Sequence, residues 1–316
     1  MTAAWAACGA SVTGSLHQLR GLGCDDAYSF GVVGDFVVAA VADGAGSVSG
    51  TSAWGAHVAC QSVLDDAMRP TFIDQYRSAS PDDAAALVRL LFASALERVQ
   101  RQAAAMGVDV LLLSTTLCVA LASRDQATFG QIGDGVIATE GNGSIDTLLI
   151  ERKAEYANTT SFLQSERALD ESFRTVTLRG VTAFALSTDG MSYKITNVAT
   201  GEPYEPFFRG CWQHLRSGAS TDQFAALLGG IEDDQTGDDK TMVLAVVCQD
   251  AGGTVSPRVT VDASPPPAGN TRAVDGLDHA RRRTQSIATA DIEAATVPFS
   301  TGAPLRRRWR WGRQRT

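Results

Sequence analysis

Apolar runs of strand length recur through the first 249 residues of this 316-residue chain. The stretch YSFGVVGDFVVAAVA holds two of these runs, and Gly34–Asp35 between them predicts a hairpin. Further strands are predicted, in chain order, by the runs TTLCVALA, ATFGQIG, VIATE, DTLLI, TVTLR, VTAFALS and TMVLAVV. Most of these runs are joined by short turns, which is typical of antiparallel pairing.

Two segments between the strands show helical periodicity. In TSAWGAHVACQSVLDDAM, apolar positions recur every three or four residues and predict one helix. A second helix is predicted from about Asp82 to Met106, where Leu87, Leu91 and Val99 fall on one face. Strands and helices in this order predict an α+β fold, in which antiparallel sheets have their helices outside.

Composition changes near residue 250. The segment AGGTVSPRVTVDASPPPAGNTRAV is poor in large apolar groups and rich in Pro, Gly and Ser, so residues 250–316 are predicted to be a disordered linker with a basic Arg/Trp tail. Residues 251–316 hold 11 Arg and five acids, a net charge of +6, which leaves −14 on the preceding 250 residues. That charge argues against nucleic-acid binding by the globular part, predicted as one domain over residues 1–249.

The tail leaves several interpretations open. Its end, PLRRRWRWGRQRT, suits anionic lipid, nucleic acid, an acidic partner or the acidic body of the same chain, and a solvated end without a partner is equally compatible. The stretch RRRTQS around Thr284 resembles the site of a basophilic kinase, through which the protein would be regulated.

Cysteine usage and the N-terminus indicate a cytoplasmic location. The six cysteines are scattered among apolar or small neighbours without a C-x-x-C pair, which predicts buried free thiols. The start MTAAWAACGASVTG lacks the basic and apolar regions of a signal peptide, and no run approaches the ~20 apolar residues of a membrane span. The abundance of Ala and of Arg over Lys indicates a bacterial source.

Acidic residues stand at the ends of several apolar runs. Three runs end in Asp-Gly pairs, Asp43–Gly44, Asp134–Gly135 and Asp189–Gly190, and two begin after the pairs Asp25–Asp26 and Asp238–Asp239. Antiparallel neighbours bring the end of one strand beside the start of the next, so these acids can collect at one edge. Asp-Gly is also a common turn pair, but crowded carboxylates would need divalent cations, and oxygen ligands suit Mg²⁺ or Mn²⁺.

Other catalytic motifs are missing from the sequence. The D-x-D of haloacid-dehalogenase phosphatases is not met, because Val41 and Ser187 stand two residues before Asp43 and Asp189. The sequence contains no G-x-x-x-x-G-K-[ST], H-E-x-x-H or G-x-S-x-G. Its four histidines form no ligand pair at helical spacing, and His57 on the apolar helix stripe is predicted to be packed.

The order of motifs resembles that of the metal-dependent type 2C (PPM) Ser/Thr protein phosphatases over about residues 9–249. The corresponding segments are CDDAY at 24–28, VADGAGS at 41–47, STT at 114–116, GDG at 133–135, STDG at 187–190 and DDKT at 238–241. The resemblance implies a four-layer αββα sandwich, in which two antiparallel sheets pack face to face between helices. It also implies two Mn²⁺ or Mg²⁺ ions, with a third, weaker ion in some members.

The resemblance assigns catalytic and metal-binding roles to individual acids. Asp43 would bridge both ions, with the carbonyl of Gly44 on one of them, and Asp189 and Asp238 would complete one metal. Asp26 would hold the other metal through its bound waters.

Further residues complete the implied site. Asp25 would assist Asp26, and Asp134 matches an acid that some members use for the third ion. Many members bind the phosphate through an Arg five residues before the Asp that matches Asp26, but this chain has Gly21 there. Arg20, one residue earlier, and His17 are the candidates for that contact.

The implied reaction is hydrolysis of a phosphoserine or phosphothreonine in a protein. Two cations about 3.5–4 Å apart can lower the pKa of a shared water from ~15.7 towards neutrality, and the resulting hydroxide attacks phosphorus. The substrate would be a phosphoprotein that is the target or product of a Ser/Thr kinase. A catalytically weak pseudophosphatase that binds phosphoproteins, and a hydrolase of a small phosphorylated metabolite, remain alternatives.

The segment between Asp189 and Gln223 has two interpretations. Phe207, Phe208 and Trp212 would either cover the active site as part of a variable flap or belong to ordinary packing.

Overall fold

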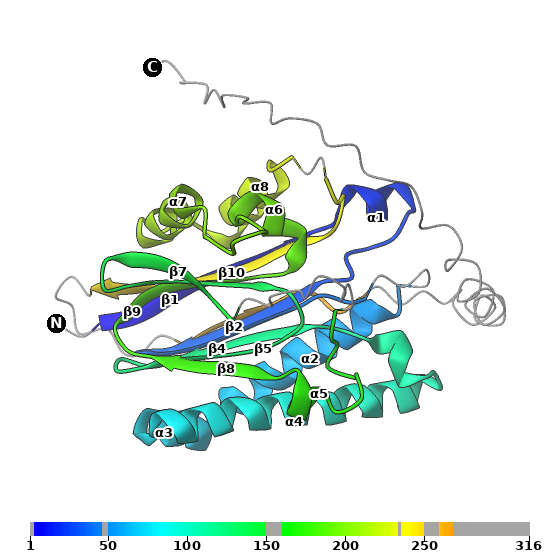
Figure 1. The fold of residues 1–316 in the computed structure, drawn as a ribbon, viewed down its shortest axis with the longest axis horizontal. Helices are drawn as coiled ribbons and strands as arrows, with labels where there is room; N and C mark the ends of the chain where they lie inside the picture. The colour runs from blue at the N-terminus through cyan, green and yellow to red at the C-terminus, as the bar shows by residue number, and fades with distance from the viewer. Residues whose placement is uncertain (1–2, 46–49, 150–159, 233–234, 250–258, 268–316) are drawn as a thin grey trace, which may run out of the picture. The chain divides into compact units, whose positions relative to one another are not determined.

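The computed structural model describes residues 3–45, 50–149, 160–232, 235–249 and 259–267. These residues lie in one compact unit, Met1–Gly269. Two antiparallel sheets pack face to face, and helices cover the outer face of each sheet (Figure 1). The four-layer αββα architecture expected from the sequence is therefore confirmed.

The first sheet, sheet A, has five strands in the order β1-β10-β9-β6-β7. Every neighbouring pair is antiparallel. Its strands are β1 (Ala3–Val12), β6 (Val136–Gly141), β7 (Ser144–Leu148), β9 (Val181–Ser187) and β10 (Lys240–Gln249).

The second sheet, sheet B, has six strands in the order β11-β2-β3-β4-β5-β8. The predicted hairpin is its centre, with Val33 opposite Phe36 and a left-handed Gly34 (φ 61°) in the turn. Its strands are β2 (Ala27–Val33), β3 (Phe36–Ala42), β4 (Leu117–Ala122), β5 (Ala127–Ile132), β8 (Arg174–Leu178) and β11 (Val259–Ala263).

Aromatic side chains fill the space between the sheets. The ring of Phe184 on β9 lies 5.5 Å from that of Trp5 and 5.7 Å from that of Phe129 on β5, measured between centroids. Alternate residues of β3 face this core, including Val37, and the others, including Val38, face the helices. Because β3 is buried on both faces, its sequence is a continuous apolar run rather than an alternating one.

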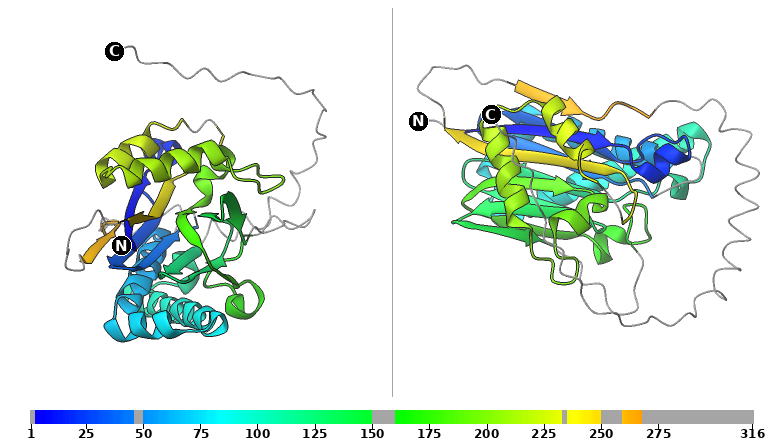
Figure 2. Two further views of the ribbon diagram at one scale, coloured as in Figure 1. Left: turned by 90° about the vertical axis from the view of Figure 1, so that its left-hand side faces the viewer. Right: turned by 90° about the horizontal axis from the view of Figure 1, so that it is seen from above.

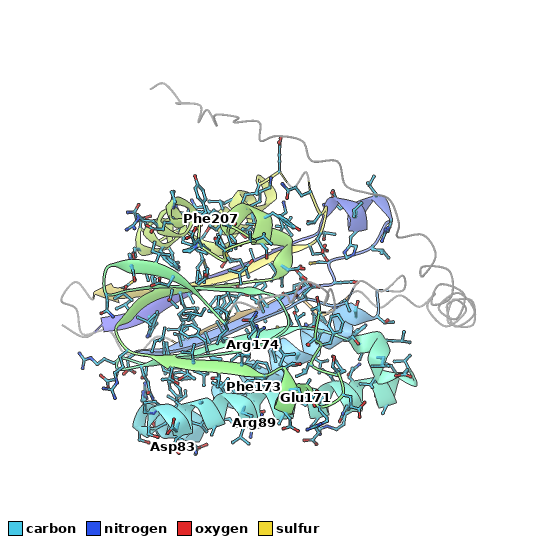
Figure 3. The ribbon with its side chains drawn as sticks, in the orientation of Figure 1. Asp83, Arg89, Glu171, Phe173, Arg174 and Phe207 are labelled. Carbon is cyan, nitrogen blue, oxygen red and sulfur yellow. The ribbon has the colours of Figure 1, made fainter. Side chains whose placement is uncertain are left out.

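Helices α2 (Ser52–Ala67), α3 (Pro70–Ser78) and α4 (Pro81–Met106) cover sheet B, as Figure 2 shows. The Ser80 hydroxyl caps α4 by accepting from the Asp83 N–H, and left-handed Gly107 (φ 66°) ends it. The helix is joined to β4 through the 3₁₀ turn η1 (Val110–Leu113). Phe173 lies in the chain between the short α5 (Ala168–Glu171) and β8. Its ring packs on Arg89 of α4, with 5.8 Å between the guanidinium carbon and the ring centroid (Figure 3).

Helices α7 (Glu205–Arg216) and α8 (Thr221–Gly229) cover sheet A, after the 3₁₀ turn η2 (Asp189–Met191) and the short α6 (Ser192–Ile195). Phe208 and Trp212 are fully buried side chains of α7, and the Trp212 indole N–H donates to the carbonyl of Phe184 at 3.1 Å. Phe207 packs on Phe208 with 5.5 Å between ring centroids (Figure 3). Of the two interpretations of these aromatic residues, ordinary packing is the one observed.

Two strands differ from the sequence-based expectation. Strand β1 was not predicted, because its Ala-rich sequence AAWAACGASV lacks the large apolar residues that mark strands. Strand β11 lies within the segment predicted as linker and pairs with β2, so the compact unit extends past the expected boundary near residue 250. Its residues Val259 and Val261 are exposed, which explains why β11 resembles a linker in composition.

Two stretches of the C-terminal segment, one before and one after β11, lie outside the described residues. They are residues 250–258 and 268–316, which include Thr284 and the Arg/Trp tail. Within the described part, no helix is long and apolar enough to cross a membrane. None of the described cysteines is in a disulfide, and Cys8, Cys60, Cys118 and Cys211 are buried, as the sequence predicts.

Candidate active site

Strand ends bring the predicted acids together at one end of the sandwich. In sheet B, Ala27 pairs with Ala42, so Asp26 and Asp43 flank that pair on neighbouring strands. In sheet A, Met242 of β10 pairs with Ser187 of β9, so the start of β10 lies beside the end of β9. The antiparallel registers therefore produce the gathering of acids that their positions in the sequence predicted.

Four carboxyl groups interact at this point. Burial, followed by the charges of Asp26, Asp189 and Asp238 and a hydrogen bond with Asp189, raises the pKa of Asp43 well above its ordinary value of 3.8. Burial, followed by the charge of Asp239, raises the pKa of Asp26 in the same direction. These carboxyl groups form a single electrostatic unit, whose ionisation the protein disfavours.

The donor chemistry of this unit fits a hard divalent cation. In the described part of the chain, no cationic side chain is among the groups that shift the pKa of Asp26 or Asp43. Buried carboxylates without a compensating charge are costly, and Mg²⁺ and Mn²⁺ prefer carboxylate oxygens. In their present side-chain conformations, however, the described residues contain no group of three or more His, Cys, Asp or Glu that could hold a metal ion.

The STT segment holds the main chain of Asp43. The Asp43 N–H donates to the Thr116 hydroxyl at 3.0 Å. The Asp43 carbonyl accepts from the Thr116 N–H and the Thr115 hydroxyl, both at 2.9 Å. The same threonine pair therefore satisfies both main-chain groups of Asp43 and orients its side chain at the strand end.

Two glycines that follow acids are required by close backbone contacts. A Cβ on Gly44 would lie 2.6 Å from the carbonyl oxygen of Asp25, and one on Gly190 would lie 2.0 Å from that of Asp239. Ordinary contacts begin near 3.4 Å. The Asp-Gly pairs are therefore more than turns, because their glycines let two acid-bearing segments meet backbone to backbone.

Thr188 contributes a contact that the sequence did not reveal. Its hydroxyl donates to a carboxylate oxygen of Asp26 at 2.7 Å and accepts from the Thr241 N–H at 3.2 Å. The Thr188 N–H in turn donates to the Thr241 carbonyl at 3.1 Å. Thr188 thus links the starts of β2 and β10, and its position directly before Asp189 was the only signal in the sequence.

Asp239 is the second residue with an unpredicted role. Its carboxylate accepts from the N–H groups of Gly14 and Asp25, both at 2.6 Å, and lies 2.8 Å from Nδ1 of His17. Burial and the charges of Asp26 and Asp239 also raise the pKa of the neighbouring Cys24 thiol. The sequence could identify Asp239 only as one of two consecutive acids.

The remaining predicted site residues lie around this centre. The buried Asp25 accepts a hydrogen bond from the Ser52 hydroxyl of α2 at 2.9 Å. The carboxylate of Asp134 accepts from the Thr160 hydroxyl at 2.9 Å and is not among the groups that shift the pKa of Asp26 or Asp43 in the described part. The loop that carries it is held by Arg174, whose guanidinium donates to the Gly133 carbonyl at 2.6 Å (Figure 3).

The two candidates for a phosphate contact differ in exposure. Arg20 is exposed and follows helix α1 (Ser15–Leu19), next to left-handed Gly21 (φ 67°). His17, on the same helix, is 8% exposed and its Nδ1 faces Asp239. Arg20 therefore remains accessible to a ligand, whereas His17 is engaged within the protein.

A comparison with protein families decides the family of this chain. The model of the family described as Protein phosphatase 2C matches residues 13–229. The chain belongs to this family. The matched residues contain the described segments that carry the site except Asp238, Asp239 and the start of β10.

A solved structure of a phosphatase shares the fold of this protein phosphatase 2C family member, and two further structures are similar at lower scores. A bacterial serine phosphatase superposes with a TM-score of 0.51 at 13% identity, over 78% of this chain and 99% of that one. The catalytic domain of the serine threonine protein phosphatase PstP, in complex with two manganese ions, gives 0.48 at 15% identity, over 78% and 100%. RsbX in complex with magnesium gives 0.45 at 16% identity, over 77% and 96%. No curated protein matches the chain.

Proposed function

We propose that this protein is a metal-dependent phosphoprotein phosphatase that hydrolyses phosphoserine or phosphothreonine with water activated by two Mn²⁺ or Mg²⁺ ions. The observation that carries the proposal is the unit of Asp26, Asp43, Asp189 and Asp238, in which Asp26 is buried and the other three are half-buried, in a member of the protein phosphatase 2C family. The pKa values of Asp26 and Asp43 are raised, and bound divalent cations would favour the ionised forms of these two carboxyl groups.

Each acid has an assigned role in this proposal. Asp43 would contribute to holding both ions and the Gly44 carbonyl to holding one of them, while Asp189 and Asp238 would hold one ion. Asp26 would hold the other through water. Asp25 would assist Asp26, and Asp134 would hold a third, weaker ion.

When bound, the two ions provide a water of lowered pKa as the nucleophile and offset the charge of the phosphoryl oxygens. The protein contributes the position of its carboxylates. Thr115 and Thr116 hold the main chain of Asp43, and Thr188 donates to Asp26 at 2.7 Å. Arg20, exposed on the loop before Asp25, is the proposed contact to the phosphate of the substrate.

Cysteine chemistry is a poor alternative route to phosphate hydrolysis here. Burial raises the pKa of Cys8, Cys118 and Cys211 to about 12, so these thiols are almost wholly protonated at neutral pH. The thiolate is the nucleophilic form of cysteine. A covalent phosphocysteine mechanism therefore finds no activated group among these residues.

The second candidate is a catalytically weak protein that binds phosphoproteins without turnover. It is favoured by Gly21, which stands where many family members have the phosphate-binding Arg. In both cases the partner is a phosphoprotein, the target or product of a Ser/Thr kinase, and the proposed location is the cytoplasm.

The deciding experiment is hydrolysis of a phosphothreonine peptide and of p-nitrophenyl phosphate by the full chain across an Mn²⁺ titration. The proposal expects metal-dependent turnover that disappears in Asp43→Asn. Peptide binding without turnover at any Mn²⁺ concentration would support the binding protein instead. Turnover confined to small phosphomonoesters would assign a metabolite substrate.

A further inference from the structure

The carboxylate of Asp239 joins three separate parts of the chain. It is 2% exposed, and its two oxygens receive hydrogen bonds from two main-chain groups and contact one imidazole. Oδ1 accepts from the Gly14 N–H at 2.6 Å, and Oδ2 accepts from the Asp25 N–H at 2.6 Å and lies 2.8 Å from Nδ1 of His17. We call these four residues, Gly14, His17, Asp25 and Asp239, the Asp239 junction.

The positions of its members make the junction relevant to the acidic unit. Asp239 directly follows Asp238, and Asp25 directly precedes Asp26. The hydrogen bond between the Asp25 N–H and the Asp239 carboxylate therefore sets the distance between two main-chain segments that each carry one acid of the site. Because one carboxylate accepts from both Gly14 and Asp25, the junction links these main-chain segments to the segment of Asp238.

Gly14 shows how closely the segments pack. A Cβ at this position would lie 2.3 Å from the carbonyl carbon of Asp238 and 2.4 Å from its oxygen. The main chain of the segment that leads to α1 thus rests directly on the main chain of Asp238. The imidazole of His17 then fixes the orientation of the carboxylate, because Oδ2 is shared between His17 and the Asp25 N–H.

The stability of the whole fold depends on contacts outside the Asp239 junction, so the junction affects only the segment around it. Strands β1 and β10 pair over ten consecutive residues, from Ala3 opposite Gln249 to Val12 opposite Lys240. That ladder, together with the aromatic core between the sheets, holds β10 in place without His17. The junction governs the last few residues before the ladder, where Asp238 is located.

We propose that His17 and Asp239 are positioning residues, which set the spacing of Asp26 and Asp238 and thereby the affinity of the proposed site for divalent cations. This inference rests on the proposed function, because it assumes that these acids bind the metal. It assigns His17 to the metal site through Asp239 and not to the phosphate.

The test is direct Mn²⁺ binding to the full chain, measured by calorimetry without substrate, for the wild type and for His17→Leu, His17→Asn and His17→Gln. The amide nitrogen of Asn can occupy the place of Nδ1, whereas that of Gln falls further out. Loss of residues that orient metal ligands costs about 10–100-fold in affinity. The expected result is a loss of this size in His17→Leu and His17→Gln, with Asn close to the wild type.

A matched control is Gln18→Ala on the same helix, which removes an exposed hydrogen bond from the Gln18 amide to the Thr13 carbonyl. It is expected to leave Mn²⁺ affinity unchanged. Thermal melts identify variants that unfold, and the comparison of Asn with Gln remains decisive if His17→Leu does not fold. A second readout is the Mn²⁺ concentration for half-maximal turnover, which should rise while the KM for phosphopeptide at saturating Mn²⁺ stays constant.

The outcomes separate the two proposals. Equal Mn²⁺ affinity in the wild type, Asn and Gln proteins would overturn the positioning role and leave the proposed function intact. Mn²⁺ binding that depends on His17, but without turnover in the wild type, would support the positioning role and overturn the phosphatase. A wild type that binds no Mn²⁺ would overturn both.

Discussion

Gly190→Ala tests whether close contact between acid-bearing segments controls activity. The added Cβ would lie 2.0 Å from the carbonyl oxygen of Asp239, whereas ordinary contact begins near 3.4 Å. The main chain must therefore separate by about 1.4 Å, the difference between these two distances. Gly190 is not among the glycines with positive φ, so backbone strain does not contribute.

The expected effect is larger on activity than on stability. A misplacement of about 1 Å in a catalytic constellation can cost roughly 10²-fold in rate, and Asp189 and Asp238 are adjacent to the two residues that must separate. Overpacking costs about 1–3 kcal/mol, which corresponds to a decrease of roughly 2–12 °C in Tm for a domain of this size. The variant should therefore remain folded at 25 °C with phosphatase activity reduced about 100-fold.

The assay is Mn²⁺-dependent hydrolysis of p-nitrophenyl phosphate, with a thermal melt of each protein. Gly210→Ala is the matched control, because Gly210 is in helix α7 and an added Cβ meets no atom within 4 Å. Ala in a helix is favoured over Gly by about 0.5–1 kcal/mol, so the control should be slightly stabilised and fully active. Activity of Gly190→Ala within threefold of the wild type would refute the reasoning.

Three further predictions follow from burial. In metal-free protein, Asp43→Asn should raise the Tm measured by scanning fluorimetry at pH 7.5. The pKa of Asp43 is raised in the folded state, so its carboxyl group destabilises the folded protein as pH rises above 3.8. A lower Tm in the variant would contradict this reasoning. Trp212→Ala should cost about 3–5 kcal/mol in urea unfolding, since the indole is fully buried and donates to Phe184; a cost under 1 kcal/mol would exclude tight packing there. Burial lowers the pKa of His57 beside Trp54, so the contribution of His57 to stability is complete above pH 6.5 and is lost as pH falls through its lowered pKa. His57→Gln should therefore reduce the difference between the urea midpoints at pH 7.5 and pH 5.5. An identical difference in the wild type and the variant would disprove this prediction.

Most of the architecture could be predicted from sequence because its elements are strongly patterned. The helix expected from about Asp82 to Met106 is observed as Pro81–Met106, where Pro, a Ser cap and a final Gly mark both ends. Strands buried on both faces were equally clear. The strands missed were β1, whose Ala-rich sequence carries little strand preference, and β11, whose Val side chains are exposed at the sheet edge; helices α3, α7 and α8 were not predicted either.

The candidate site was predictable in its residue types but only partly in its contacts. Acids at strand ends can meet when strands pair antiparallel, so a unit around Asp43 could be expected from the sequence. The path of the preceding loop decides whether the side chain of an acid contacts other carboxyl groups or a hydrogen-bond donor. The segment from Gly14 to Asp25 follows no periodic pattern, and its contacts with Asp239 could not be inferred without coordinates.

The contrast between Asp239 and Asp43 shows that acids at strand ends serve two purposes. The carboxylate of Asp239 accepts hydrogen bonds from the N–H groups of Gly14 and Asp25 and lies 2.8 Å from Nδ1 of His17. Asp43 instead has other carboxyl groups among its neighbours, and these destabilise its ionised form. A carboxylate that accepts main-chain hydrogen bonds helps to hold the backbone segments in place, whereas carboxylates that repel one another would be stabilised by a bound cation. The interior of the sandwich supplies the stability that allows the second arrangement to persist at its edge.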